Sequence, residues 1–562
     1  MNWQQSENKT KNKIIPEYNS PEKCSLAGGT ANKKNMPLYI LLPVIVISLA
    51  VSLPLIYLLF RVSAVDLSII SLLRREQTIR ALFNTVSLAA AVTISSILVA
   101  LPLGWLTVRS NLPGKKYWGI LAMVPLVIPS LIGGFTFVSA FGQGGLISSF
   151  LQQLNLNFIP DIYGFFGTWI LLTLLCYPYI FLPVRSTLLG MKQSQIEAAR
   201  TLGLDSWQIF YKITLPKLKP AITGGSMLVI LYTISDFAAV SLLQFNTFTR
   251  MIYIQYQTSF NRTYAAFLAL ILVLMAFVIV ALEMKNRGQT NYHSIGSGAE
   301  RQLSPLPLGK WKGPALLFCV TIIGLALILP ITVSTFWLIR GLIQGEQIII
   351  RPVAALNSFS AATITSVLAI FAALPIAIMS TEYKSKLSSL LEKFSYIGYA
   401  LPGIVVALAL VFFGANYAGV FYQTLPLLIF AYIILFLPQA LGSLRSSLLQ
   451  INPHLEEAGL TLGFSSFKVL TKITVPLIKP GILSGAALVF LTIMKELPAT
   501  LILSPIGYRT LTTEIWNATI EAFYARAAAP SLLLIMISTL SMAVLFYQEN
   551  HSSFSQEEKN DN

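Results

Sequence analysis

The sequence predicts an all-α integral membrane protein of about twelve transmembrane helices, arranged as two homologous six-helix halves. Three observations support this fold class. The chain has 562 residues, of which 55% are hydrophobic and only 11% charged, a balance too apolar for an ordinary water-soluble domain. Uncharged segments long enough to cross a hydrocarbon core of roughly 30 Å recur throughout the chain. A polar stretch of 24 residues also occurs twice, with 12 identical positions.

The apolar segments are expected to be helices. Backbone groups in lipid must be satisfied within their own segment, and none of these runs shows the strict alternation of a barrel strand. The clearest runs from Tyr39 to Phe60. In chain order the approximate spans are 38–60, 84–108, 118–141, 163–184, 220–244, 264–282, 314–339, 357–380, 394–413, 425–444, 480–503 and 528–547.

The connections between these spans predict the topology. The first 36 residues contain six lysines, and they are too long and polar for a cleaved signal peptide, so we expect a retained cytoplasmic tail. Basic connections at 109–116, 285–288 and 382–393 then face the cytoplasm, and the connections at 143–162 and 414–424, which lack Lys and Arg, face outward.

The basic connection at 62–80 does not follow this rule, and we interpret it as an amphipathic helix on the outer surface. The net charge of +16 is otherwise explained by this topology, so it predicts contact with the bilayer and no binding of nucleic acid.

Internal repetition defines the domains. Beyond the polar stretch, which repeats after 260 residues, a second set of positions repeats after 273: Asn84 with Asn357, Pro102 with Pro375, and Pro129 with Pro402. Six spans per half, an even number, place both halves the same way up about an axis along the membrane normal. The predicted divisions are a cytoplasmic tail (1–36), a first transmembrane domain (37–284), a cytoplasmic linker (285–312), a second transmembrane domain (313–547) and a cytoplasmic tail (548–562).

The repeated polar stretch, 197–220 and 457–480, is expected to fold as two short helices on the cytoplasmic side. Ile196, Ala199 and Leu202 fall on one side of the first helix, and Gly203 suits a left-handed cap at its end. Asp205 and Gln208 have the spacing of a capping box. A proline is then expected to end the second helix.

This stretch resembles the EAA loop, E-A-A-x3-G-x9-I-x-L-P, of permease subunits in ATP-binding cassette importers of the type I fold. The first copy fits at Glu197, Ala198, Ala199, Gly203, Ile213, Leu215 and Pro216. The second fits at Glu457, Ala458, Gly463, Ile473 and Pro476, and departs at Gly459 and Val475. In that family the loop couples the permease to a nucleotide-binding subunit, so the resemblance implies two copies of an ATPase subunit that use ATP and Mg.

A narrower resemblance joins segments 234–256 and 494–516 to the fused two-domain iron(III) permeases. It implies a multi-pass protein of the bacterial cytoplasmic (inner) membrane, with both termini cytoplasmic, that receives ferric iron from an extracytoplasmic binding protein. Thiamine, polyamine, or an oxyanion such as molybdate or phosphonate stays open as the substrate.

The residues themselves indicate a transport subunit and no enzyme. The sequence contains no G-x4-G-K-[ST] loop to hold phosphates, so ATP must be hydrolysed elsewhere. The three cysteines and three histidines form no metal-ligand or catalytic pattern. We therefore expect no cofactor and no tight metal site on this chain.

Three charged residues lie within predicted spans. Asp236 and Glu496 match at the spacing of 260, and Lys495 precedes Glu496. Such groups normally face protein or a watery cavity, because placing them in mid-membrane costs about 2.5 to 3.5 kcal/mol on insertion scales. They either line a translocation pathway or bond one helix to another. An ion-driven carrier that uses the two acids as a proton relay is a further alternative.

Overall fold

The structure is a computed structural model. It describes residues 37–63, 71, 74–142, 145–153, 161–191, 193–258, 262–286, 306–346, 351–383 and 385–560. The N-terminal tail, most of the linker and much of the connection at 62–80 lie outside these ranges, and so do the predictions for them.

The described residues are almost entirely helical, as predicted. In the first half the helices are α1 (Leu38–Ser63), α3 (Glu76–Arg109), α4 (Lys115–Leu121), η1 (Val124–Val127), α5 (Ser130–Phe141), α6 (Leu146–Gln153), α7 (Phe165–Leu189), α8 (Gln193–Thr201), α9 (Ser206–Ile209), η2 (Phe210–Thr214), α10 (Leu215–Ser235), α11 (Ala238–Leu242), α12 (Phe248–Thr258) and α13 (Arg262–Asn286).

The second half repeats this order. It contains η3 (Gly309–Trp311), α14 (Lys312–Ile323), η4 (Gly324–Ile328), α15 (Leu329–Ile343), α16 (Pro352–Glu382), α17 (Lys386–Ser395), α18 (Ile397–Ala400), α19 (Gly403–Tyr417), η5 (Gly419–Phe421), α20 (Leu425–Leu448), α21 (Pro453–Thr461), α22 (Ser466–Val469), η6 (Leu470–Thr474), α23 (Val475–Leu477), α24 (Lys479–Met494), α25 (Pro498–Leu503), α26 (Leu511–Ile520) and α27 (Tyr524–Asn560). Within the described ranges, 10 helices are long and apolar enough to cross a membrane, or up to 12 if each bent pair counts as one span.

The third span of each half is broken. The sequence analysis predicted a continuous helix for both of these spans. The residues before the matched prolines, Ile128 and Leu401, have extended backbones with ψ of 117° and 115°. A proline ring disfavours helical geometry in the residue before it, so a new helix, α5 or α19, begins directly after each proline. In the second half α18 and α19 meet at a bend of 104°.

The two halves share one core because the first helix of each half packs on the other half. Helix α1 contacts α16, α17 and α19, and α15 contacts α5 of the first half. Within each half the same triple forms the centre: α3 with α7 and α10, and α16 with α20 and α24. Because each half contributes its first helix to the other half, the two repeats form a single domain-like unit.

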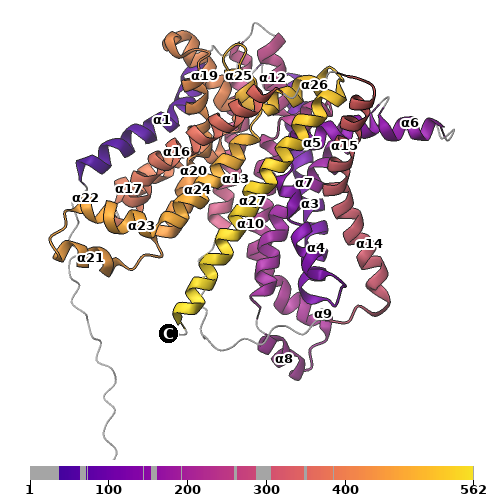
Figure 1. Cartoon of the computed structure of the whole chain (residues 1–562), viewed down its shortest axis with the longest axis horizontal. Helices are drawn as coiled ribbons and strands as arrows, with labels where there is room; N and C mark the ends of the chain where they lie inside the picture. The colour runs from indigo at the N-terminus through magenta and orange to yellow at the C-terminus, as the bar shows by residue number, and fades with distance from the viewer. Residues whose placement is uncertain are drawn as a thin grey trace, which may run out of the picture.

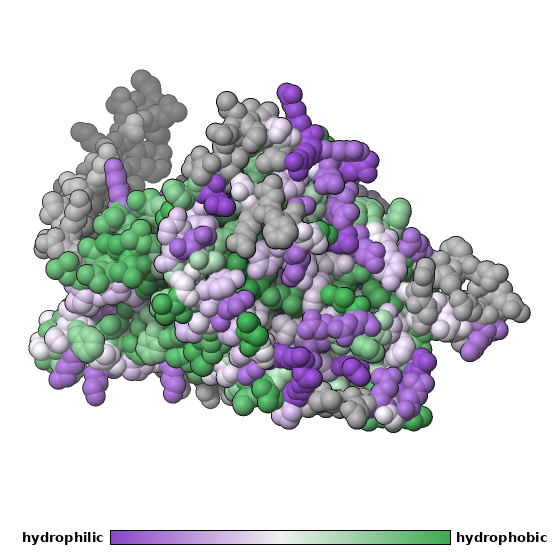
Figure 2. Space-filling model, turned by 90° about the horizontal axis from the view of Figure 1, so that it is seen from above, coloured by the Kyte–Doolittle hydropathy of each residue, from purple (hydrophilic) through white to green (hydrophobic). Residues whose placement is uncertain are grey.

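The two ends of the bundle differ. In Figure 1 the repeated polar stretches, with α8 and α9 in one copy and α21 to α23 in the other, lie at the lower end, and α12, α19, α25 and α26 lie at the upper end. Figure 2 looks down on the upper end, where hydrophilic side chains spread over much of the surface beside a hydrophobic region at the left.

Candidate functional site

The two coupling loops, defined here as residues 193–216 and 453–476, share one backbone design. Gly203 and Gly463 adopt left-handed φ angles of 79° and 83°. The N–H of Leu204 donates to the carbonyl of Ala199 at 3.1 Å, and the N–H of Phe464 donates to that of Gly459 at 3.1 Å. These bonds close the first helix in the manner of a Schellman cap, so the predicted glycine cap is confirmed.

Packing inside the first loop accounts for two of its motif residues. Ile196, Ala199 and Ile209 form a small buried cluster, against which Ile213 packs. The alanine and the isoleucine of the motif therefore hold the two short helices together. Leu202, predicted on the same side, is instead 81% exposed, because the chain turns away at Gly203.

The second loop reaches the same packing with different residues. A Cβ on Gly459 would lie 2.6 Å from Cδ1 of Ile473, so the glycine leaves room for this isoleucine to approach. Glu456 stands where the first loop has Ile196, and its Oε1 accepts a hydrogen bond from Thr474 at 2.7 Å. Ile473 thus compensates for the departure of Gly459 from the motif, because it fills the space that an alanine side chain would occupy.

The second helix of each loop begins at a side-chain cap, and the capping box predicted for the first loop is half formed. Asp205 Oδ1 accepts from the N–H of Trp207 at 3.4 Å, and Gln208 Oε1 accepts from the N–H of Asp205 at 3.3 Å. In the other loop Ser465 Oγ accepts from the N–H of Lys468 at 3.4 Å, which is half of such a box.

The predicted proline stop is wrong. Five residues of π-helix, Phe210–Thr214 and Leu470–Thr474, precede the prolines, and the chain stays helical through Pro216 into α10. A π-turn shifts the hydrogen-bond register, so the missing proline N–H and the bulky ring are accommodated at the start of the next helix. In the second copy the helix bends by 68° after Leu477 instead.

An exposed apolar and acidic surface remains on both loops. Trp207 is 66% exposed and stacks on Tyr211 with a centroid separation of 5.7 Å, and Phe467 is also 66% exposed. The motif glutamates are exposed as well: Glu197 accepts a hydrogen bond from Gln193, and Glu457 lies 3.2 Å from His454. These faces have the character of a protein contact surface.

The matched intramembrane acids sit where the fifth span of each half breaks. Helix α10 ends before Asp236 and α24 ends before Lys495, and a short helix follows each break. Asp236 Oδ1 accepts from the N–H of Ala239 at 3.0 Å, and Glu496 Oε1 accepts from that of Ala499 at 3.2 Å. Each carboxylate therefore caps the short helix that follows it.

Lys495 reaches across to the other half. Its Nζ donates to the carbonyl of Leu126 in η1 at 3.0 Å. Asp236 is buried, with 7% of its surface exposed, whereas Glu496 is half-buried and lies so close to Gly403 that a Cβ there would be 2.6 Å from its Oε1. In the described part of the chain, no three His, Cys, Asp or Glu side chains form a group that could hold a metal ion. The pathway role of the three residues stays a prediction.

The sequence reasoning missed an aromatic cluster between the halves. Tyr253 of α12 and Trp516 of α26 occupy equivalent positions in the repeats, and their rings lie 6.1 Å apart at 88°. Phe237 contacts both rings, at 4.8 Å and 5.1 Å. A residue and its symmetry mate can touch only near their common axis, so this cluster marks the pseudo-two-fold axis.

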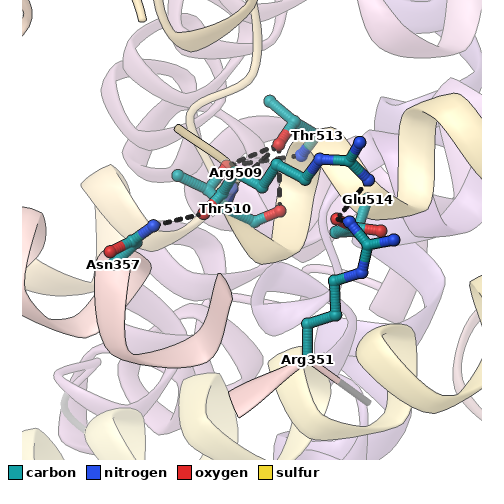
Figure 3. Close-up of polar contacts among 6 residues, drawn as sticks. All are labelled: Arg351, Asn357, Arg509, Thr510, Thr513 and Glu514. Atoms are coloured by element: carbon teal, nitrogen blue, oxygen red, sulfur yellow. Dashed lines mark hydrogen bonds and ion pairs between the residues drawn. The ribbon is translucent and has the colours of Figure 1, made fainter. Parts of the chain in front are cut away.

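The upper end of the second half has a charged cluster of its own (Figure 3). Glu514 Oε1 lies 3.2 Å from Nη1 of Arg509 and 3.6 Å from Nη1 of Arg351. Asn357 Nδ2 donates to the carbonyl of Arg509 at 2.9 Å, and its repeat mate Asn84 donates to that of Asn246 at 2.9 Å. The predicted asparagine pair thus ties the same two segments together in each half.

The fold and its repeated loops define a class: a multi-pass transport permease with two pseudo-symmetric halves. The chain belongs to the family of binding-protein-dependent transport system inner membrane components, which matches residues 96–283 and 365–552. It is therefore an inner-membrane protein of a binding-protein-dependent transport system.

Several transport permeases are similar to it. The Fe(3+)-transport system permease protein FbpB 2 of Haemophilus influenzae is 34% identical over 515 residues, covering 91% of this chain and 98% of the relative. The ferric transport system permease protein FbpB of Actinobacillus pleuropneumoniae is 24% identical, covering 85% of this chain and 72% of the relative. The molybdenum transport system permease protein ModB of Escherichia coli is 28% identical, covering 35% of this chain and 89% of the relative.

Proposed function

We propose that this chain is the membrane permease of an ATP-driven importer that takes ferric iron from an extracytoplasmic binding protein. The observation that carries the proposal is the pair of matched coupling loops at one end of the bundle, each with an exposed apolar and acidic face. A single loop of this kind could merely cover the membrane surface, but two at equivalent positions fit two copies of one ATPase subunit.

The motion follows from where the parts lie. ATP binding draws the two ATPase subunits together and moves both coupling loops toward the axis. Because α9, η2 and α10 form one unbroken helical path from the first loop, its displacement reaches the break at Asp236. Tyr253 and Trp516 must then separate before substrate can enter along the pseudo-two-fold axis.

The distribution of basic residues supports a cytoplasmic location for the two termini and, with them, for the coupling loops. ATP and Mg bind the ATPase subunits. This chain supplies the translocation pathway and the two coupling loops. Asp236, Glu496 and Lys495 are the residues we assign to the path, where two carboxylates near the axis attract a cation without a closed ligand set to trap it.

Iron is proposed as the substrate because the relative that is 34% identical over 91% of this chain, and a second that covers 85% of it, are named for ferric iron. Relatives named for molybdenum and sulfate match about a third of the chain, which makes an oxyanion the competing substrate. Thiamine and polyamine remain alternative substrates only because of the family resemblance described above.

Reconstitution tests the substrate and the energy source together. The chain is placed in proteoliposomes with its cognate ATPase, and binding proteins charged with ferric iron, molybdate, thiamine or polyamine are added outside. We expect uptake of iron only, and only with ATP inside. Uptake of molybdate in preference to iron would contradict the substrate, and uptake of any cargo without the ATPase would contradict the mechanism and favour a carrier.

A further inference from the structure

Two arginines at matched positions differ in whether they have an acidic partner. Arg185 of α7 and Arg445 of α20 are related by the spacing of 260. Nε of Arg445 lies 3.3 Å from Oε1 of Glu392 in α17, so its charge is compensated. Among the residues that the structure describes, no carboxylate forms an ion pair with Arg185, and its buried Nε has no hydrogen-bond partner. Because a guanidinium stays protonated, the first half keeps an uncompensated charge here.

A glycine stands where the second half has this carboxylate. Gly119 of α4 corresponds to Glu392 at the spacing of 273. A Cβ on Gly119 would lie 3.3 Å from Nε and 3.5 Å from Nη2 of Arg185. The guanidinium of Arg185 therefore lies against α4 at the place where Arg445 meets the acid of α17. The two halves have the same geometry here and differ in the missing acid.

Two lysines add to the positive charge of the first half. Lys115 and Lys116 lie one helical turn before Gly119, on the same side of α4, and both reach the surface. Ser388 and Ser389 occupy these positions in the second half. Together with the arginine, the first half thus has three cationic groups at this place, whereas the second half has one cation and one carboxylate.

Helix α4 has the side chains of a helix at a membrane interface. Tyr117 and Ile120 are exposed, and the indole N–H of Trp118 donates to the carbonyl of Pro113 at 3.0 Å. Tyrosine and tryptophan are enriched at the level of the lipid headgroups. In Figure 1, α4 lies nearer the middle of the bundle than α8 and α9 do. The three cations are therefore set back from the end at which the ATPase is proposed to dock.

We propose that Arg185, Lys115 and Lys116 bind the phosphate of an anionic phospholipid in the cytoplasmic leaflet. The phosphate supplies between α4 and α7 the negative charge that Glu392 supplies in the second half, and the acyl chains lie along the exposed apolar side chains of α4. Basic pockets between transmembrane helices bind such headgroups on the cytoplasmic side. The inference rests on the proposed function only for the choice of leaflet, and it does not depend on the substrate or the ATPase.

Native mass spectrometry of the full chain, released from a neutral detergent, tests the proposal. The chain is titrated with phosphatidylglycerol or phosphatidylcholine, and soluble glycerol phosphate is added as a competitor. We expect one phosphatidylglycerol to bind at least fivefold more tightly than phosphatidylcholine, and equimolar glycerol phosphate to leave it bound. Equal affinity for the two lipids overturns the proposal. So does displacement by glycerol phosphate, which would make this a site for free phosphate.

The repeat supplies the matched variants. Arg185→Gln should lower the affinity for phosphatidylglycerol about fivefold, the worth of one cation at a membrane surface, whereas Arg445→Gln removes a charge that is already paired and should not lower it. Gly119→Glu introduces the acid of the second half and should also lower the affinity about fivefold, and Gly119→Gln, of the same size, should lower it less. Lys115→Gln with Lys116→Gln, at the surface, should lower it even if the other variants fail to fold. Equal affinities within either matched pair, or no loss for the lysine pair, overturn the proposal.

ATPase binding separates this site from the coupling loops. In nanodiscs of phosphatidylcholine, Arg185→Gln should leave the affinity for the cognate ATPase unchanged, because the residue lies outside both loops. A fivefold loss would assign the cations to a carboxylate of the ATPase and overturn the lipid site. The lipid titrations use the chain without its ATPase, so their result stands whichever way the proposed function is decided.

Discussion

Replacing the turn glycines is expected to weaken ATPase docking by a predictable amount. Gly203 and Gly463 have left-handed φ angles, and a Cβ on either would meet nothing within 4 Å. The cost of Gly→Ala is therefore the backbone strain alone, about 1–2 kcal/mol for a left-handed L-residue. The free loop already has this turn, so the strain lowers affinity only if the alanine loop relaxes out of the turn before docking; full relaxation then lowers the affinity about 5- to 30-fold for each loop.

Titration of the cognate ATPase against the chain in nanodiscs measures this loss directly. Gly203→Ala and Gly463→Ala are measured singly and together, and the effects of the two distant sites should multiply. Gly→Asn should cost less at both positions, because asparagine tolerates the left-handed region.

Gly224→Ala in α10 is the matched control. This glycine also has open space around its missing Cβ but a negative φ, so the substitution should leave affinity unchanged. Equal losses for Gly203→Ala and Gly224→Ala, or no loss for either loop glycine, would refute the reasoning that the turn sets the docking geometry.

Three further sets of substitutions test other parts of the site. Asp236→Asn with Glu496→Gln keeps an oxygen to cap each short helix, so thermal stability should hold while iron uptake falls several-fold; full uptake would remove both acids from the pathway. Trp516→Ala vacates a buried ring, at a cost of about 3–5 kcal/mol, and should let small solutes leak into liposomes, whereas Trp516→Phe should stay sealed. Glu514→Gln leaves two exposed arginines unpaired and should cost under about 1 kcal/mol in a thermal unfolding assay; a larger loss would mean that the cluster is structurally essential.

Local signals in the sequence were sufficient for much of the architecture. The length and hydropathy of the spans, the fixed repeat spacing and the need for a glycine at Gly203 each depend on a few neighbouring residues. The break of the third span at Pro129 and Pro402 had a local signal too, since the residue before a proline avoids the helical region. The continuous hydropathy of both segments nevertheless favours one unbroken span.

Other features depend on how distant segments meet. The π-turn before Pro216 shifts the hydrogen-bond register, and proline chemistry alone predicts a stop there. The packing of α1 on the second half and of α15 on the first half has no recognisable pattern in the sequence of either half. The contact of Tyr253 with Trp516 was hidden because segments 234–256 and 494–516 differ by a short insertion, so the two residues do not align at the spacing of 260. Aligning the segments through the threonines before them would have paired these rings.

The stoichiometry of the assembled transporter tests the central claim most directly. Native mass spectrometry of the chain, purified with its ATPase in the presence of a non-hydrolysable ATP analogue, should give two ATPase copies for each chain. Gly203→Ala or Gly463→Ala should each lower the population with two copies and enrich the complex with one. A complex with a single ATPase, or none, in the unaltered chain would contradict the account that paired coupling loops receive the work of ATP hydrolysis.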